Sequence, residues 1–149
     1  MIRRKVMSLK SLSKAGSRMP SRVIAGSYEG KQGPAFTFTP IQLWDVELKS
    51  GKAVDFKLED GHTVALLCFN GELTLNAKKK LGRSELALFS RQGETITVAA
   101  EKDSKILLMS GEPIPEPVVG YGPFVMNSHA EIGQAIQDYQ SGKMGTLDG

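Results

Sequence analysis

The chain has 149 residues, of which 40% are hydrophobic and 23% are charged, and these values are typical of one soluble globular domain. A single cysteine, Cys68, excludes an internal disulfide and a paired-cysteine metal or redox motif. No run approaches the roughly 18 consecutive apolar residues that a membrane span requires, so we expect a cytoplasmic protein.

Residues 1–21 form a basic leader that we predict to be disordered. Residues 1–22 contain seven of the 19 basic side chains and none of the 16 acidic ones, so acidic side chains outnumber basic ones in the rest of the chain. The folded body is therefore mildly acidic, which disfavours nucleic-acid binding by the body. On a helical wheel Ile2, Val6, Leu9 and Leu12 gather on one side, so organelle targeting is an alternative role for the leader. Contact with nucleic acid or a membrane surface is a further alternative.

Residues 22–110 are predicted to form an antiparallel β-barrel or sandwich. Short apolar runs alternate with turn residues, and a new run begins about every ten residues. The predicted strands are Ile41–Leu48, Ala53–Leu58, Thr63–Phe69, Glu72–Asn76, Glu85–Phe89, Thr95–Ala99 and Lys105–Ser110. The predicted breaks between strands include Ser50-Gly51, Asn70-Gly71 and Lys80-Leu81-Gly82. Cys68 lies inside one of these runs, which indicates a buried structural thiol.

Two local features of this region carry specific expectations. The Asn70-Gly71 pair favours a tight turn with positive φ at both central residues, so it predicts a hairpin between the flanking strands. The apolar phase of residues 41–48 shifts near Trp44, which suggests a β-bulge there.

Residues 111–149 are predicted to form an apolar strap, a short helix and a tail. The strap, residues 111–127, contains four prolines, and residues 113–123 cannot be an interior strand, because proline has no N–H to donate to a sheet. We expect its apolar side chains Tyr121, Phe124, Val125 and Met126 to contact either the chain's own barrel or a partner. Ser128 and Glu131 outline a capping box, and Gly142 predicts the end of the helix.

The sequence resembles the carboxyl-terminal half of the pirin family over residues 21 to 145. The motifs that carry the resemblance are Arg22-Val23-Ile24-Ala25-Gly26, Gly33-Pro34, Thr37-Phe38-Thr39-Pro40, Leu43-Trp44-Asp45, Gly111-Glu112-Pro113-Ile114 and Gly122-Pro123-Phe124-Val125-Met126-Asn127. Pirins are bicupins, with two cupin barrels in one chain. The resemblance implies that residues 22–110 form the second barrel, and that the metal-binding first barrel is absent from this sequence.

A cupin metal site would require a His-x-His pair, a carboxylate and a later histidine, which suit a divalent iron-type metal. If Gly71 closes the first cupin motif, the expected ligand positions fall near Leu58, Asp60, Val64 and residues 93–95. One carboxylate in four positions cannot hold a catalytic metal. We therefore expect no metal and no cofactor, and we expect a barrel filled by side chains.

The remaining chemical candidates are weak. His62 and His129 lie far apart in the sequence; His62 is predicted to be a turn or rim residue and His129 a solvent-facing residue of the helix. Glu59 and Asp60 indicate a solvated turn, and the run Lys78-Lys79-Lys80 a solvated loop. Ser84, Ser90 and Ser110 have no histidine at a plausible spacing, so we expect no catalytic residue.

These observations favour a non-catalytic pirin-like module that acts through protein–protein contacts or as a homodimer. One alternative is a part of a metal-dependent oxygenase of the quercetin 2,3-dioxygenase type, which would require a separate amino-terminal barrel. The other alternative is a truncated remnant.

Overall fold

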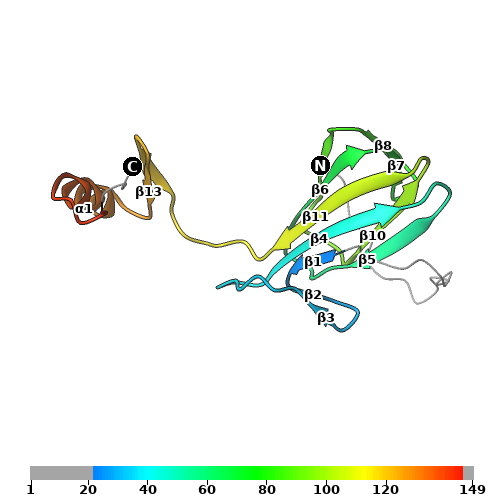
Figure 1. Cartoon of the computed structure of the whole chain (residues 1–149), viewed down its shortest axis with the longest axis horizontal. Coiled ribbons are helices and arrows are strands. Elements are labelled where there is room, and N and C mark those ends of the chain that lie inside the picture. The colour runs from blue at the N-terminus through cyan, green and yellow to red at the C-terminus, as the bar shows by residue number, and fades with distance from the viewer. Residues whose placement is uncertain (1–21, 146–149) are drawn as a thin grey trace. The chain divides into compact units, whose positions relative to one another are not determined.

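The computed structural model describes residues 22–145, so the predicted leader lies outside the described residues (Figure 1). The chain divides into two compact units: the first extends to Pro113, and the second begins at Ile114. Along the described chain, no helix is long and apolar enough to cross a membrane.

The first unit consists of antiparallel strands in two main sheets. One sheet has the order β1 (Arg22–Ala25), β4 (Ile41–Leu48), β11 (Ser104–Gly111), β6 (Thr63–Asn70) and β9 (Leu86–Leu88). The other has the order β5 (Ala53–Lys57), β10 (Thr95–Ala100), β7 (Glu72–Leu75) and β8 (Lys79–Gly82). A small ribbon pairs β2 (Ser27–Tyr28) with β3 (Lys31–Gln32).

One hydrophobic core joins the two sheets, because alternate residues of each strand point inward. Strand β5 contributes Val54 and Phe56, and β10 contributes Ile96 and Val98, as their alternation predicts. Cys68 is fully buried in the same core, and burial raises the pKa of its thiol. Each large apolar side chain buried in this way contributes roughly 1.5 to 3 kcal/mol.

The predicted hairpin at Asn70-Gly71 is wrong, because β6 and β7 belong to different sheets and the chain crosses between them at this point. Gly71 has φ +98, and a Cβ there would lie 2.0 Å from Ser104 Oγ. The backbone N–H of Glu72 donates to the same oxygen at 3.2 Å. Close approach to the start of β11, and not the geometry of a tight turn, thus explains the glycine.

The tight turn with two positive φ angles occurs a few residues later. Asn76 and Ala77 have φ of 49° and 55°, and the Lys78 N–H donates to the Leu75 carbonyl at 3.0 Å. This turn joins β7 to β8, so the expected break at residues 80–82 is wrong: these residues pair with Glu72, Leu73 and Thr74. The Asn76 side chain stabilises the turn, because its Oδ1 accepts from the Thr97 N–H at 2.9 Å.

The bulge predicted within β4 lies instead in its neighbour β1. Strand β4 pairs with β11 without interruption, from Ile41 opposite Gly111 to Leu48 opposite Ser104. The register of β1 against β4 shifts between Val23 and Ala25, opposite Trp44 and Leu43. The apolar phase of β4 shifts without a bulge, because Ile41 and Leu43 lie on the outer side of the sheet whereas Trp44, Val46 and Leu48 are buried in the core.

The second unit is a β-hairpin followed by helix α1 (His129–Gln140). Strands β12 (Val119–Tyr121) and β13 (Phe124–Met126) pair around a Gly122-Pro123 loop, so the strap folds back on itself and is not one continuous extended segment. Gly122 has φ +54, and the ring of Pro123 restricts the next φ to negative values, which is the pattern of a type II′ turn. The prolines lie outside both strands, where no N–H is required.

The predicted caps of the helix are confirmed. Ser128 Oγ accepts from the Glu131 N–H at 3.3 Å, while Glu131 Oε2 accepts from the Asn127 N–H at 2.9 Å. At the other end Gly142 has φ +76, its N–H donates to the Tyr139 carbonyl, and the Lys143 N–H donates to the Asp138 carbonyl. These two bonds form a Schellman motif, which ends the helix.

Candidate functional site

The positions that the cupin spacing assigns to metal ligands lie at one end of the barrel, and two of them belong to the core. Leu58 is 7% exposed and Val64 is completely buried, and neither has an atom that can coordinate a metal. Asp60 Oδ1 accepts from the Gly93 N–H at 2.6 Å, so this carboxylate joins two turns. Within residues 22–145, no three His, Cys, Asp or Glu side chains gather closely enough to hold a metal ion. The donor set at these positions does not fit the metal that the cupin resemblance implies.

His62 lies in the turn before β6, as predicted, but its side chain is buried. Its Nδ1 lies 3.3 Å from Ser110 Oγ on β11, and Ser110 is 4% exposed. The two residues lie 48 positions apart in the sequence, so no local pattern connects them. A buried serine oxygen cannot reach a substrate, so we interpret the pair as a polar contact inside the barrel. His129, the first residue of α1, is exposed, as predicted.

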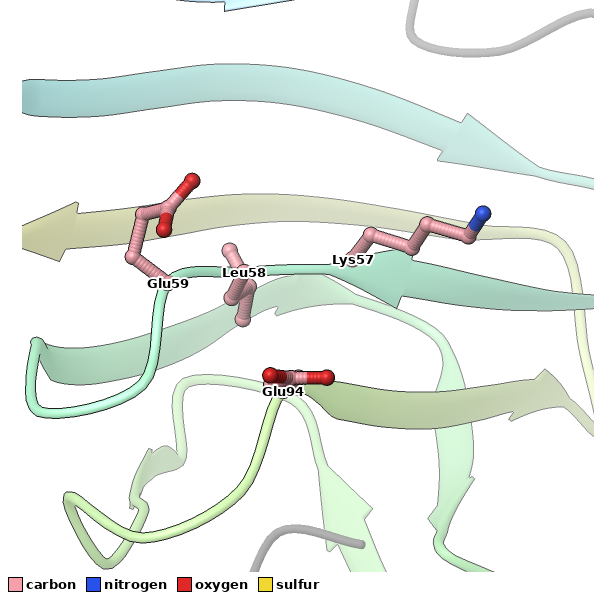
Figure 2. A pocket seen from close by; sticks show the side chains of 4 residues that line it. All are labelled: Lys57, Leu58, Glu59 and Glu94. Carbon is pink, nitrogen blue, oxygen red and sulfur yellow. The ribbon is translucent and has the colours of Figure 1, made fainter. Parts of the chain in front are cut away.

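A pocket of about 210 Å³ opens beside these turns (Figure 2). It is lined by Lys57 and Leu58 at the end of β5, Glu59 in the following turn, and Glu94 before β10. The Leu58 N–H donates to the Glu94 carbonyl oxygen at 2.8 Å, which holds the two segments together. In Figure 2 the two carboxylates do not point toward each other, so they do not form an acid–base pair.

The lysine run at residues 78–80 takes part in a cluster on the four-stranded sheet. Lys80 Nζ lies 3.4 Å from Glu72 Oε1, and Lys102 Nζ lies 3.1 Å from Glu72 Oε2. The hydrogen bond from Lys102, together with that from Lys80, lowers the pKa of the Glu72 carboxyl. Both lysine side chains are more than 70% exposed, so the cluster is a solvated group of ion pairs.

The four predicted contact residues lie together on the β12–β13 hairpin, but they differ in exposure. Phe124 and Met126 are half-buried, and the Phe124 ring meets the ring of Tyr139 on α1 at a centroid distance of 6.3 Å. Tyr121 is 68% exposed and Val125 is 66% exposed. The first pair therefore holds the unit together, while the second pair is available at its surface.

Two further apolar side chains of the strap, Ile114 and Val118, are 62% and 80% exposed. Asn127 Nδ2 donates to the Pro117 carbonyl at 2.9 Å and fixes the entry of the chain into the hairpin. The signal in the sequence was the density of large apolar residues among prolines and glycines. We call Ile114, Val118, Tyr121 and Val125 the hairpin surface. The register pairs Tyr121 with Phe124 and Val125 with Gly120, so the side chains of Tyr121 and Val125 lie on opposite faces of the hairpin.

The two antiparallel sheets around one core define a cupin-type barrel. Residues 43–145 match the Pirin C-terminal cupin domain, and the chain therefore belongs to the pirin family. A solved structure, quercetin 2,3-dioxygenase from Acinetobacter baumannii, is 40% identical and has a TM-score of 0.79; the likeness covers 85% of this chain and 44% of that chain.

Curated relatives give the same result. A pirin-like protein of Solanum lycopersicum is 36% identical over 126 residues, which cover 83% of this chain and 43% of the relative. Pirin of Homo sapiens is 32% identical over 128 residues, which cover 83% of this chain and 44% of the relative. The chain thus spans less than half the length of the relatives that it matches.

Proposed function

We propose that this chain is a pirin-family cupin module that acts through protein–protein contacts and carries no catalytic centre of its own. The observation that supports the proposal most strongly is chemical: the cupin ligand positions include Leu58 and Val64, which are core residues. The residues proposed to make the contact are Tyr121, Phe124, Val125 and Met126. Tyr121 and Val125 would meet the partner, while Phe124 and Met126 would support them from inside the unit.

The size of the second unit also supports a contact role. Within residues 114–145, two side chains are buried, Ile132 and Ala135. Units below about 40 residues usually require a disulfide, a metal or an association to fold stably. The same short segment exposes the four apolar side chains of the hairpin surface. Docking of this surface would supply the missing apolar burial, at roughly 25 cal/mol per Å².

The test uses the part of a relative that lies outside the region this chain matches. The amino-terminal portion of the Acinetobacter baumannii protein would be expressed separately, and its binding to this chain measured by calorimetry. We expect Val125→Asp to weaken binding at least tenfold, because a charge would enter an apolar contact. Gln137→Asp, which adds the same charge at an exposed position of α1, is the matched control. Binding that is absent, or equal for both variants, would contradict the proposal.

A second candidate function is suggested by the name of the 40% identical structure. In this alternative the chain forms part of a metal-dependent quercetin dioxygenase whose ligands come from another barrel. Quercetin absorbance would be followed with iron present, for this chain, the separate portion and their mixture. If the activity of the amino-terminal portion rises when this chain is added, the result favours this alternative. If that activity does not change, the result supports the contact role and not the alternative. Together with the contact role, we propose a cytoplasmic location, because a reducing compartment suits the buried thiol of Cys68.

A further inference from the structure

The loop between β3 and β4, residues 33–40, presents two aromatic rings to solvent. Phe36 is 84% exposed and Phe38 is 96% exposed, which are the highest values among the exposed large hydrophobic side chains of residues 22–145. Their rings meet edge to face at a centroid distance of 5.3 Å. A single exposed apolar side chain is ordinary, whereas two neighbouring rings that contact each other outside the core form a patch. We call residues 33–40 the aromatic loop.

The base of the aromatic loop is fixed to the barrel. The Ala35 N–H donates to the Ile24 carbonyl at 3.1 Å, and the Pro40 carbonyl accepts from the Glu112 N–H at 3.2 Å. A Cβ on Gly33 would lie 2.6 Å from the carbonyl carbon and oxygen of Ile24, so the loop packs against β1 at this point. In Figure 1 the loop projects beyond the end of β1. The backbone therefore holds the two rings outward, and little conformational entropy is left to lose when they bind.

The exposed part of the aromatic loop is entirely uncharged. Its sequence is Gly-Pro-Ala-Phe-Thr-Phe-Thr-Pro, and its exposed residues are Pro34, Ala35, Phe36, Phe38 and Pro40. A protein partner would have to provide a pocket for both rings. The interfacial region of a bilayer accepts projecting apolar side chains without such a pocket. The shape and composition of the loop thus favour a lipid surface.

The charge of the chain next to β1 indicates which lipids would be bound. Residues 1–22 contain seven basic side chains and no acidic one, while acidic side chains outnumber basic ones in the rest of the chain. Arg22 begins β1, the strand to which the aromatic loop is bonded. Anionic lipids give the cytoplasmic leaflet a negative surface potential, which attracts basic segments. An apolar contact and a basic segment together bind such a surface more firmly than either one alone.

We propose that this chain binds the surface of anionic membranes through the aromatic loop and the basic residues 1–22. Phe36 and Phe38 enter the interfacial region, and the basic side chains lie against the anionic headgroups. Neither ring belongs to the hydrophobic core, so insertion does not disturb the barrel. The contact is peripheral and reversible. It does not depend on the hairpin surface, so this proposal and the protein-contact role can fail separately.

Vesicle flotation with the full chain tests this proposal. One set of vesicles contains phosphatidylcholine with phosphatidylserine, and the other contains phosphatidylcholine alone. The wild type should bind the anionic vesicles at least about tenfold more strongly, and added sodium chloride should reduce this preference because salt screens the basic side chains. Phe36→Ser combined with Phe38→Ser should weaken binding to the anionic vesicles at least about tenfold at constant salt, because the apolar contact is lost.

Leu86→Ser combined with Leu88→Ser is the matched control. It replaces two apolar side chains of β9 that are 53% and 52% exposed by the same residue, far from the aromatic loop in the sequence. This control should bind anionic vesicles as the wild type does. Thermal melts of both double variants would show that each is folded.

A second measurement separates insertion of the loop from adsorption of the basic residues. Trp44 is the single tryptophan of the chain and is 2% exposed, so brominated lipid chains should not quench the emission of the wild type. Phe38→Trp places a second indole on the aromatic loop. Its emission should be quenched when the anionic vesicles carry brominated acyl chains, because quenching requires contact with the bromine atoms.

Four results would overturn the proposal. The first is a wild-type protein that does not bind anionic vesicles. The second is binding that the serine substitutions in the aromatic loop leave unchanged, or that the leucine control weakens equally. The third is emission of Phe38→Trp that brominated lipid does not quench. The fourth is an aromatic-loop variant that binds vesicles normally but loses binding to the amino-terminal portion of the Acinetobacter baumannii protein, because the loop would then be a protein contact.

Discussion

Replacing Gly71 by alanine tests how the chain crosses from one sheet to the other. An alanine Cβ at this position would lie 2.0 Å from Ser104 Oγ and 2.7 Å from the Asp103 carbonyl oxygen. The serine side chain could rotate, but the carbonyl belongs to the backbone before β11. The residue also has φ +98, which L-amino acids rarely adopt. The substitution therefore adds a steric clash to backbone strain.

Gly61 separates the two effects. It has a similar φ of +85, but a Cβ there would meet nothing within 4 Å. Gly61→Ala should cost about 1 to 2 kcal/mol, the strain of a left-handed backbone alone. Gly71→Ala should cost at least about 3 kcal/mol, because β11 must also shift.

Urea and thermal unfolding of the two variants would measure the difference. For a domain of about 60 to 100 residues, each kcal/mol corresponds to about 4 to 8 °C in Tm. Gly71→Ala should therefore melt at least about 5 °C below Gly61→Ala. Equal losses of stability would refute the close approach of Gly71 to Ser104. They would indicate that the glycine is required only for the positive φ of a tight turn, as the sequence predicted.

Three further predictions concern separate parts of the chain. Phe124→Ala removes the ring that meets Tyr139, so amide exchange in α1 should accelerate while the melting of the barrel stays unchanged; unaltered exchange would show that the ring contributes nothing. Because Lys102 helps to lower the pKa of Glu72, this carboxylate stabilises the fold above its unfolded pKa, and the contribution is lost as pH falls through the folded pKa. The stability difference between wild type and Glu72→Gln should therefore vanish in acid; a difference that grows there would contradict the ion pairs. Cys68 should react with a thiol reagent only as the barrel opens, so labelling that is fast under native conditions would exclude its burial.

The strands were predictable where the pattern is set within one strand. Residues 41–48 form β4 as predicted, because the inward side chains recur at every second position. The error at Asn70-Gly71 arises because two different structures require the same pair of residues. A tight hairpin needs positive φ, and so does a crossing that passes close to Ser104. The local sequence contains no information about Ser104, which lies far along the chain.

The candidate site was predictable to a similar extent. Tyr121 and Val125 were singled out because apolar residues are unusual beside so many prolines and glycines, and their role in a contact stays a prediction. The apolar outer side of the five-stranded sheet was missed, although Leu86 and Leu88 lie in a predicted strand. One strand with two apolar residues on its outer side is ordinary. Only the register, which places Leu88 next to Ala65 and Leu86 next to Leu67, turns these residues into a continuous surface.

The two units differ in how far their folding depends on a partner. The barrel has a large core of its own, so its fold does not require further apolar contact. Two side chains, Ile132 and Ala135, are buried within residues 114–145, so the order of this unit depends more strongly on what it contacts. A partner of the hairpin should therefore alter the folding of residues 114–145 and leave the folding of the barrel unchanged. Hydrogen exchange measured with and without a partner would test this, because binding at the hairpin should slow exchange in α1 and leave exchange in the barrel strands unchanged.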